Sequence, residues 1–327
     1  APVLNDTDAE WLSAAKAMPV DSWPLAVRLD LPDWLFERLS AKYPLDIEAL
    51  ATALNRPAPL DLRINPMKVT REAVLQRLAA DGMPGTACVH SPLGIRLEEK
   101  PALSRHPLFL DGSIEVQDEG SQLLGYLVAP KRGEMVVDFC AGAGGKTLLL
   151  GALMRSAGRL YAFDVSEKRL ANLKPRLARS GLSNVHPVRI ESENDIKVKR
   201  LAGKLDRVLV DAPCSGLGTL RRNPDLKWRQ SPESVTELTQ KQHDILTAAA
   251  RLVKSGGRLV YATCSLLAEE NEDVVSAFLA AHPDFVPLNA AEILSRQGIN
   301  VGDEAALRLL PHVHGSDGFF AMAMERK

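Results

Sequence analysis

The chain has 327 residues, of which 46% are hydrophobic and 25% charged, and its formal net charge is −1. This length suffices for two domains, and no apolar run approaches the roughly 18 residues of a membrane span. The first twenty residues contain three acidic side chains and lack an apolar core, which argues against a secretory signal. We therefore expect a globular, cytoplasmic protein, and nothing in the sequence demands more than a monomer.

The four cysteines, Cys88, Cys140, Cys214 and Cys264, lie far apart and include no Cys-x-x-Cys pair. This spacing argues against a structural zinc site and against a disulfide framework, so we expect no bound metal. In a reducing compartment these thiols stay free for chemistry.

The N-terminal part of the chain divides into two segments of different pattern. Residues 1–59 are predicted to be helical, with Asp46 as the cap of the second helix. Residues 60–115 combine a strand over 60–64 with a helix over 70–80 and several turns. We expect this second segment to form a small α+β domain.

From residue 116 onward the chain alternates between strands and helices. The alternation predicts a doubly wound, Rossmann-like parallel sheet over 116–327, with an antiparallel pair over 307–310 and 319–324. The predicted parallel strands are 135–140, 159–164, 187–190, 207–212 and 258–264. The predicted helices are 118–128, 146–155, 167–180, 232–253 and 269–281.

A glycine-rich turn follows the first of these strands, in the sequence Asp138-Phe-Cys-Ala-Gly-Ala-Gly-Gly-Lys-Thr147. Such a turn between a strand and a helix is typical of a nucleotide-binding crevice. A P-loop would need glycine at Cys140, and a dinucleotide fingerprint beginning at Gly142 would need glycine at Thr147. The remaining pattern, Asp-x-Cys-x-Gly-x-Gly, resembles the first motif of class I S-adenosylmethionine (SAM)-dependent methyltransferases.

Three further strand ends carry side chains suited to a ligand site. Asp164 ends the second strand, where a carboxylate can bind both hydroxyls of a ribose or can cap the next helix. Asp211 and Cys214 end the fourth strand, and Cys264 ends the fifth. A buried cysteine is usually a small core residue, but two at the ligand-facing ends of strands favour a chemical role.

A thiol here would solve a chemical problem, because C5 of a pyrimidine is a poor nucleophile toward a methyl sulfonium. Attack of a thiolate on C6 makes C5 reactive, after which the ring takes the methyl group, loses the C5 proton to a base and expels the thiol. Asp211 could hydrogen-bond the N3/N4 edge of the base, and nearby cations would favour the thiolate. The residues alone do not decide whether Cys214 or Cys264 attacks.

Positive charge is concentrated over residues 195–229, where nine Lys or Arg residues stand against four Asp, a net charge of +5. The loop after Cys214 carries four of these cations, Arg221, Arg222, Lys227 and Arg229. We expect them to contact nucleic-acid phosphates, and we expect Trp228 to anchor the loop rather than to stack on a base.

Short motifs distributed over residues 60–327 occur here in a specific combination. They are Asn65-Pro66, Gln117-Asp-Glu-Gly-Ser-Gln122, Asp211-Ala-Pro-Cys-Ser-Gly216, Ala262-Thr-Cys-Ser265, Glu269-Glu-Asn-Glu272 and Asp317-Gly-Phe-Phe320. Together they resemble the RsmB/Nop/Sun family of RNA cytosine-5 methyltransferases. The resemblance implies a SAM-dependent enzyme that modifies a single-stranded or flipped-out cytidine, with ribosomal RNA as the expected substrate. Alternatives are a transfer-RNA methyltransferase, a non-catalytic RNA-binding or assembly factor, and a small-molecule or protein methyltransferase.

The resemblance also implies roles for individual residues. In the family the cysteine of Thr-Cys-Ser is the nucleophile, here Cys264, and the cysteine of Pro-Cys-Ser assists product release, here Cys214. The implied catalytic residues are Cys264, Cys214, Asp211 and Lys146. The implied SAM contacts are Cys140, Ala141, Gly142, Ala143, Gly144, Gly145, Lys146, Asp164, Glu193 and Asp211, where Glu193 is chosen from an acidic stretch for the adenine. The small domain is expected to have an RRM-like shape, although it lacks the aromatic signature for base stacking.

Overall fold

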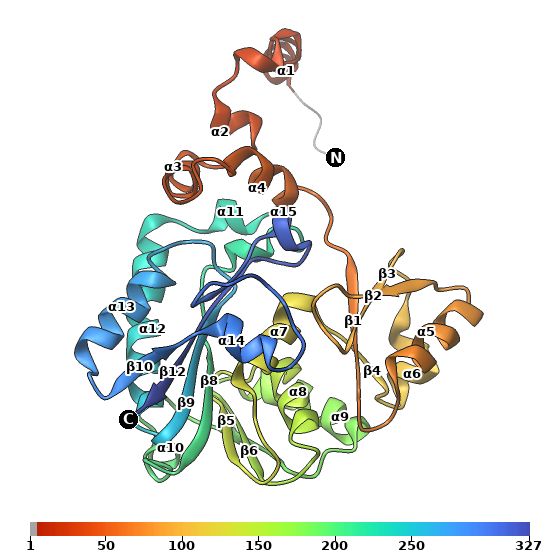
Figure 1. Cartoon of the computed structure of the whole chain (residues 1–327). Coiled ribbons are helices and arrows are strands. Elements are labelled where there is room, and N and C mark those ends of the chain that lie inside the picture. Colours follow the sequence, from red (N-terminus) through yellow and green to blue (C-terminus); the bar gives the residue numbers. More distant parts are fainter. Residues whose placement is uncertain (1–4) are drawn as a thin grey trace.

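The computed structural model describes residues 5–327 and contains two sheets, with a group of helices at the N-terminal end (Figure 1). These helices are α1 (Asp6–Ala17), the short turn η1 (Val20–Ser22), α2 (Leu25–Arg28), α3 (Asp33–Lys42) and α4 (Ile47–Leu54). Apolar residues of α3 and α4, such as Leu39 and Leu50, pack against Leu217 and Leu266 of the main body. Asp46 precedes α4, but its side chain makes no capping hydrogen bond in the described chain, so that predicted cap is wrong.

The smaller sheet is antiparallel, with strand order β2-β3-β1-β4. Its elements are β1 (Leu60–Ile64), α5 (Arg71–Ala80), β2 (Gly85–Ala87), β3 (Gly94–Leu97), η2 (Leu103–Arg105), α6 (Pro107–Leu110) and β4 (Ile114–Val116). Alternation along β1 places Leu62 and Ile64 in the core under α5, while Asp61 and Arg63 point to the other face and are also buried. This β-α-β-β-α-β order is the ferredoxin-like arrangement and confirms the expected RRM-like shape.

The larger sheet has eight strands and forms the centre of the molecule (Figure 1). The strands are β5 (Met135–Asp138), β6 (Arg159–Asp164), β7 (Val185–Arg189), β8 (Leu205–Asp211), β9 (Val253–Thr263), β10 (Phe285–Leu288), β11 (Leu307–Leu309) and β12 (Phe319–Arg326). Their order is β10-β12-β9-β8-β5-β6-β7, with β11 paired to β12. The strands from β9 to β7 are parallel, whereas β12 runs antiparallel to β9, β10 and β11. The strand order reverses beside β5, and such a reversal creates a ligand crevice at the carboxyl ends of the strands.

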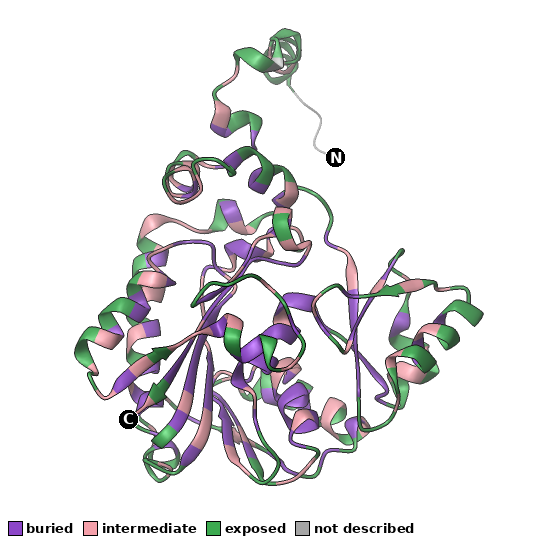
Figure 2. Ribbon diagram, in the orientation of Figure 1, coloured by how far each residue is buried: buried purple, intermediate pink, exposed green. Residues whose placement is uncertain are grey.

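Helices cover both faces of this sheet. They are α7 (Glu119–Val128), α8 (Gly145–Leu153), α9 (Glu167–Ser180), α10 (Ile196–Lys199), α11 (Leu226–Arg229), α12 (Pro232–Ala250), α13 (Glu272–Ala281), α14 (Ala290–Ser295) and α15 (Pro311–His314), with the short turn η3 (Leu217–Thr219). One apolar core contains α7, α8, α9 and α14, and the other contains α10, α12 and α13. Buried residues run along the central strands (Figure 2), as expected for a sheet covered on both sides. Within residues 5–327, no helix combines the length and apolar character that crossing a bilayer requires.

The predicted Rossmann-like class is confirmed, and the five predicted parallel strands are present, β6 with its predicted bounds and the other four with shifted ends. The largest shift is in β9, which begins at Val253 because the strand continues through Gly256 and Gly257. The edge strand β10 was not predicted, because Pro287 lowers the strand signal, and an edge strand tolerates proline. The predicted boundaries at 59/60 and 115/116 stay predictions.

Candidate active site

A cavity of about 600 Å³ opens at the carboxyl ends of β5, β6, β8 and β9. Nine of the ten predicted SAM contacts line it, namely Cys140, Ala141, Gly142, Ala143, Gly145, Lys146, Asp164, Glu193 and Asp211. Cys214 and Cys264 line the same cavity. The topology of the sheet therefore brings the glycine turn together with both thiols, although Cys214 and Cys264 lie 72 and 122 residues after Gly142 in the sequence.

Two glycines of the turn have different functions. Gly142 has φ +57°, and a side chain at this position would meet open space in the cavity. Gly144 has φ +82°, and a Cβ there would lie 2.1 Å from the Leu173 side chain. Gly144 is the one predicted SAM contact that does not line the cavity, because its role is to let α8 begin directly against α9.

Asp164 fastens the glycine turn to the end of β6. One carboxylate oxygen accepts a hydrogen bond from the Gly142 backbone N–H at 2.8 Å, and the other accepts from Ser166 N–H at 2.7 Å. The N-cap of α9 is Ser166, whose hydroxyl accepts from Arg169 N–H, so the alternative expectation that Asp164 caps this helix is wrong. Asp164 faces the cavity. Glu193 reaches the same cavity from the segment after β7, with its carboxylate hydrogen-bonded to the Asn194 amide at 2.7 Å.

Asp138, the first residue of the glycine motif, is buried. It accepts a hydrogen bond from the Thr147 hydroxyl at 2.7 Å, while its other oxygen finds no partner among residues 5–327. Burial is the main cause that raises the pKa of Asp138 to about 7, with the nearby charge of Asp211 adding to it. The carboxyl group is therefore protonated in the folded protein at mildly acidic pH.

This raised pKa predicts that Asp138 destabilises the protein as the pH rises. In the unfolded chain this carboxyl loses its proton near pH 4, whereas in the folded protein it holds the proton up to about pH 7. The contribution of Asp138 to the free energy of unfolding therefore decreases as the pH rises from about 4 to about 7. We expect Asp138→Asn to gain roughly 3 kcal/mol more at pH 8 than at pH 5, relative to the parent protein. Denaturant unfolding at both pH values measures this difference, and an equal effect at both would contradict the prediction.

Lys146 and Asp211 form an ion pair inside the cavity, with 2.7 Å between Lys146 Nζ and Asp211 Oδ2. Burial by itself would lower the pKa of Lys146, but the charge of Asp211 and the hydrogen bond to it raise that pKa above its ordinary value. Cys264 lines the same cavity as this ammonium group, and a nearby cation favours a thiolate. Lys146 also lies over the ring of Phe319, 5.7 Å from its centroid.

The sulfurs of Cys214 and Cys264 are 3.4 Å apart, within hydrogen-bonding distance for thiols. The hydrogen bond to Cys264 and burial raise the pKa of Cys214 well above its ordinary value. Cys214 is thus held as a neutral thiol that can donate its proton toward the Cys264 sulfur. Burial likewise raises the pKa of Cys140, which keeps this third thiol neutral.

The structure contradicts the prediction that Arg221 and Arg222 are free to contact phosphates. Arg221 Nη2 donates to Asp317 at 3.1 Å, and only 7% of its side chain is exposed. Arg222 donates to Asp317 at 2.6 Å and to Asp118 at 3.0 Å. Burial, together with the charge of Asp317, raises the pKa of Asp118 to about 6. These two cations fasten the loop after Cys214 to the beginning of β12 and α7.

The predictions for Lys227 and Trp228 are also wrong. Lys227 is almost completely buried and donates to Asp30 at 2.5 Å, which ties the loop to the N-terminal helices. Arg229 pairs with Asp225 one helical turn away but is 67% exposed, so its phosphate contact stays a prediction. Trp228 does not anchor the loop, because 60% of it is exposed. Both errors have one cause: whether a side chain is paired or packed depends on residues distant in the sequence.

Several cavity residues had no assigned role from the sequence, among them Gln117, Arg176 and Lys241. Gln117 accepts a hydrogen bond from Arg63 Nη1, and the same nitrogen donates to the Gly145 carbonyl at 2.8 Å. Arg176 donates to the Ala143 carbonyl at 2.7 Å. Gln117 could have been found from the sequence, because it belongs to the motif over 117–122. Nothing in the local sequence identifies Arg176 or Lys241 as cavity residues.

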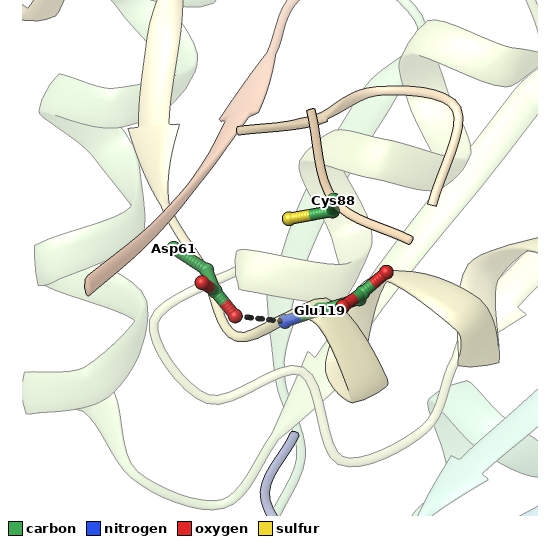
Figure 3. Close-up of side chains that lie close together, drawn as sticks. All are labelled: Asp61, Cys88 and Glu119. Atoms are coloured by element: carbon green, nitrogen blue, oxygen red, sulfur yellow. Dashed lines mark hydrogen bonds between the residues drawn. The ribbon is translucent and has the colours of Figure 1, made fainter. Parts of the chain in front are cut away.

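A second cluster, at the junction of the two sheets, has the residue types of a metal site. Asp61, Cys88 and Glu119 face one another there (Figure 3). The Asp61 carboxylate already accepts two hydrogen bonds from Arg96, at 2.8 and 2.9 Å, and a third from the Glu119 backbone. Glu119 accepts from the backbone of Ser91 at 2.9 Å. Since a guanidinium supplies the positive charge, the cluster is an interdomain polar junction and does not fit a cation.

The sheet topology and the glycine-turn cavity define the SAM-dependent methyltransferase class, and the comparisons with known proteins agree. Residues 125–325 match the family model described as "16S rRNA methyltransferase RsmB/F". Residues 31–104 match the model described as "Methyltr_RsmF/B-like, ferredoxin-like domain". The chain belongs to the RsmB/F family of SAM-dependent RNA methyltransferases, which confirms the resemblance found in its motifs.

Relatives cover nearly all of this chain. The probable ribosomal RNA small subunit methyltransferase B of Synechocystis sp. is 39% identical over 92% of this chain and 68% of its own length. The protein of the same description from Bacillus subtilis is 33% identical over 99% of this chain and 73% of its own length. Among solved structures, a methyltransferase homolog protein from Pyrococcus horikoshii is 30% identical, with a TM-score of 0.79, over 92% of this chain and 97% of its own.

Proposed function

We propose that this chain methylates C5 of a cytidine in small-subunit ribosomal RNA, through a covalent adduct between Cys264 and C6 of the base. The observation that carries the proposal is the pair of thiols 3.4 Å apart in the same cavity as the glycine turn. Methylation of an oxygen, a nitrogen or a small molecule would not require two sulfurs at this position. The RNA class is supported by the descriptions of the two ribosomal RNA methyltransferases reported above.

The cavity fits SAM in size and in its polar groups. Its volume of about 600 Å³ lies within the usual range for ligand sites. The open space over Gly142 leaves room for a ligand against the backbone. Asp164 is the proposed ribose contact and Glu193 the proposed adenine contact, supported by the position of both in the cavity lining. When bound, SAM supplies an electrophilic methyl group on a sulfonium centre.

In the proposed reaction, the Cys264 thiolate forms a bond to C6 and makes C5 nucleophilic. Lys146 stabilises the thiolate, and its ion pair with Asp211 holds both side chains at the base. After methylation, C5 loses its proton to a base, and the C6–S bond breaks with its electron pair returning to Cys264. Cys214, held as a neutral thiol, donates a hydrogen bond to the departing sulfur and so assists release.

Incubation of the purified protein with labelled SAM and unmodified small-subunit RNA tests this function. We expect label in a single RNA position, recovered as 5-methylcytidine, and no label in protein. Nucleotide-resolution mapping in cells with and without the protein identifies the cytidine. Transfer only to transfer RNA would support the alternative substrate, and absence of any transfer would support a binding factor. A monomeric state and a cytoplasmic location stay predictions.

A further inference from the structure

Glu270 lies beneath the two cysteine loops, in the turn between β9 and α13. This residue was expected in the first turn of a helix over 269–281, but α13 begins at Glu272, and Glu270 instead turns inward and is fully buried. Its carboxylate accepts hydrogen bonds from Ser215 N–H at 2.8 Å, the Ser215 hydroxyl at 2.5 Å and the Gln242 amide at 3.0 Å. All three donors are neutral, and burying a carboxylate costs free energy. A role in packing alone therefore does not explain why a glutamate occupies position 270.

Through Ser215, this carboxylate reaches the loops of both thiols. Ser215 directly follows Cys214, and Glu270 holds its backbone and its side chain together. The Ser215 hydroxyl is also 3.2 Å from the hydroxyl of Ser265, which directly follows Cys264. The contact therefore fixes one cysteine loop against the other.

Gln242 of α12 completes the support on the opposite side of Cys214. Its amide donates to the Pro213 carbonyl at 3.0 Å as well as to Glu270. The Tyr261 hydroxyl donates to the Glu270 backbone carbonyl at 2.6 Å and also lies 3.1 Å from Oε1 of the Gln242 side chain. Both neighbours of Cys214 in the chain are thus tied to one buried network.

The two thiols do not depend equally on this network. Cys264 directly follows β9, which is hydrogen-bonded to β8 on one side and to β12 on the other. Cys214 lies in a loop between β8 and η3 and has no sheet ladder to hold it. Loss of the Glu270 contacts should therefore displace Cys214 much more than Cys264.

We propose that Glu270 is a positioning residue that holds Cys214 against the Cys264 sulfur for product release, an inference that rests on the proposed covalent reaction. Glu270 does not line the cavity and acts only through Ser215 and Gln242. Its replacement should reproduce the loss of Cys214 and not the loss of Cys264.

The test compares Glu270→Gln, which keeps the side-chain size, with Ser215→Ala and with the double variant. We expect turnover on cytidine-containing RNA to fall about tenfold, the effect of one lost charge-assisted hydrogen bond. At the same time, a protein–RNA adduct that survives denaturing electrophoresis should accumulate, while SAM affinity stays unchanged. Because both residues act in one contact, the double variant should be no worse than the more impaired single variant.

Glu134→Gln is the matched control, because Glu134 pairs with Arg207 at 3.1 Å, at the opposite end of the sheet from the cysteines. This variant should leave the adduct fraction at the parent level. The proposal is overturned if Glu270→Gln lowers turnover and adduct together, or lowers only the melting temperature. If Cys214→Ala forms adduct and Glu270→Gln does not, this inference alone fails. If neither forms adduct, the covalent mechanism fails as well.

Discussion

Replacement of Cys264 with alanine is expected to abolish methyl transfer while leaving SAM binding intact. The variant lacks the sulfur that bonds to C6, so C5 of the base remains unreactive toward the methyl donor. We expect the transfer rate to fall by about 10⁴-fold or more, in the range found when a catalytic nucleophile is removed. Transfer of labelled methyl groups to RNA measures the loss, and calorimetric titration with SAM checks that the cavity is intact.

Cys88→Ala is the control for this experiment. Cys88 is a buried thiol that directly follows β2 and lies outside the cavity, and burial raises its pKa well above the ordinary value. Its replacement should leave methyl transfer at the parent rate. Full activity of Cys264→Ala would remove this thiol from the mechanism, and a loss of SAM affinity would point to a structural role instead.

Replacement of Cys214 with alanine is expected to trap the reaction after methylation. Cys264 can still attack and the methyl group can still transfer, but the departing sulfur loses the thiol that lies 3.4 Å away. The enzyme should therefore accumulate as a covalent complex with RNA. Denaturing electrophoresis of the protein with labelled RNA shows the complex as a slowly migrating band.

The same gel separates the roles of the two thiols. The double variant Cys214→Ala/Cys264→Ala should form no complex, because the attacking sulfur is gone. If Cys264→Ala trapped RNA and Cys214→Ala did not, the two roles would be exchanged. The proposed order agrees with the position of Lys146 in the same cavity as Cys264 and with the raised pKa of Cys214, which keeps that thiol neutral.

Features that depend on neighbouring residues in the chain could be predicted from the sequence. The glycine turn follows a buried strand and opens a helix, so its position at the ligand edge of a parallel sheet was predictable. The same rule placed Asp164, Asp211 and the two cysteines at that edge. Family resemblance, and not the residues alone, distinguished Cys264 from Cys214.

The hydrogen bonds and ion pairs between residues distant in the sequence could not be predicted in this way. Arg221 and Arg222 had the composition of an RNA-contacting loop, yet both pair with Asp317, about a hundred residues further along the chain. The sequence showed Glu270 only as part of a motif, whereas the tertiary structure shows that its carboxylate binds Ser215. Periodicity and turn chemistry act over a few residues, so the sequence alone determined the five parallel strands, the main helices between them and the edge that carries the site, but not the edge strand β10. The charge and burial of each side chain depend on the whole packed molecule, so only the tertiary structure decided which groups face the cavity and which are fastened beneath it.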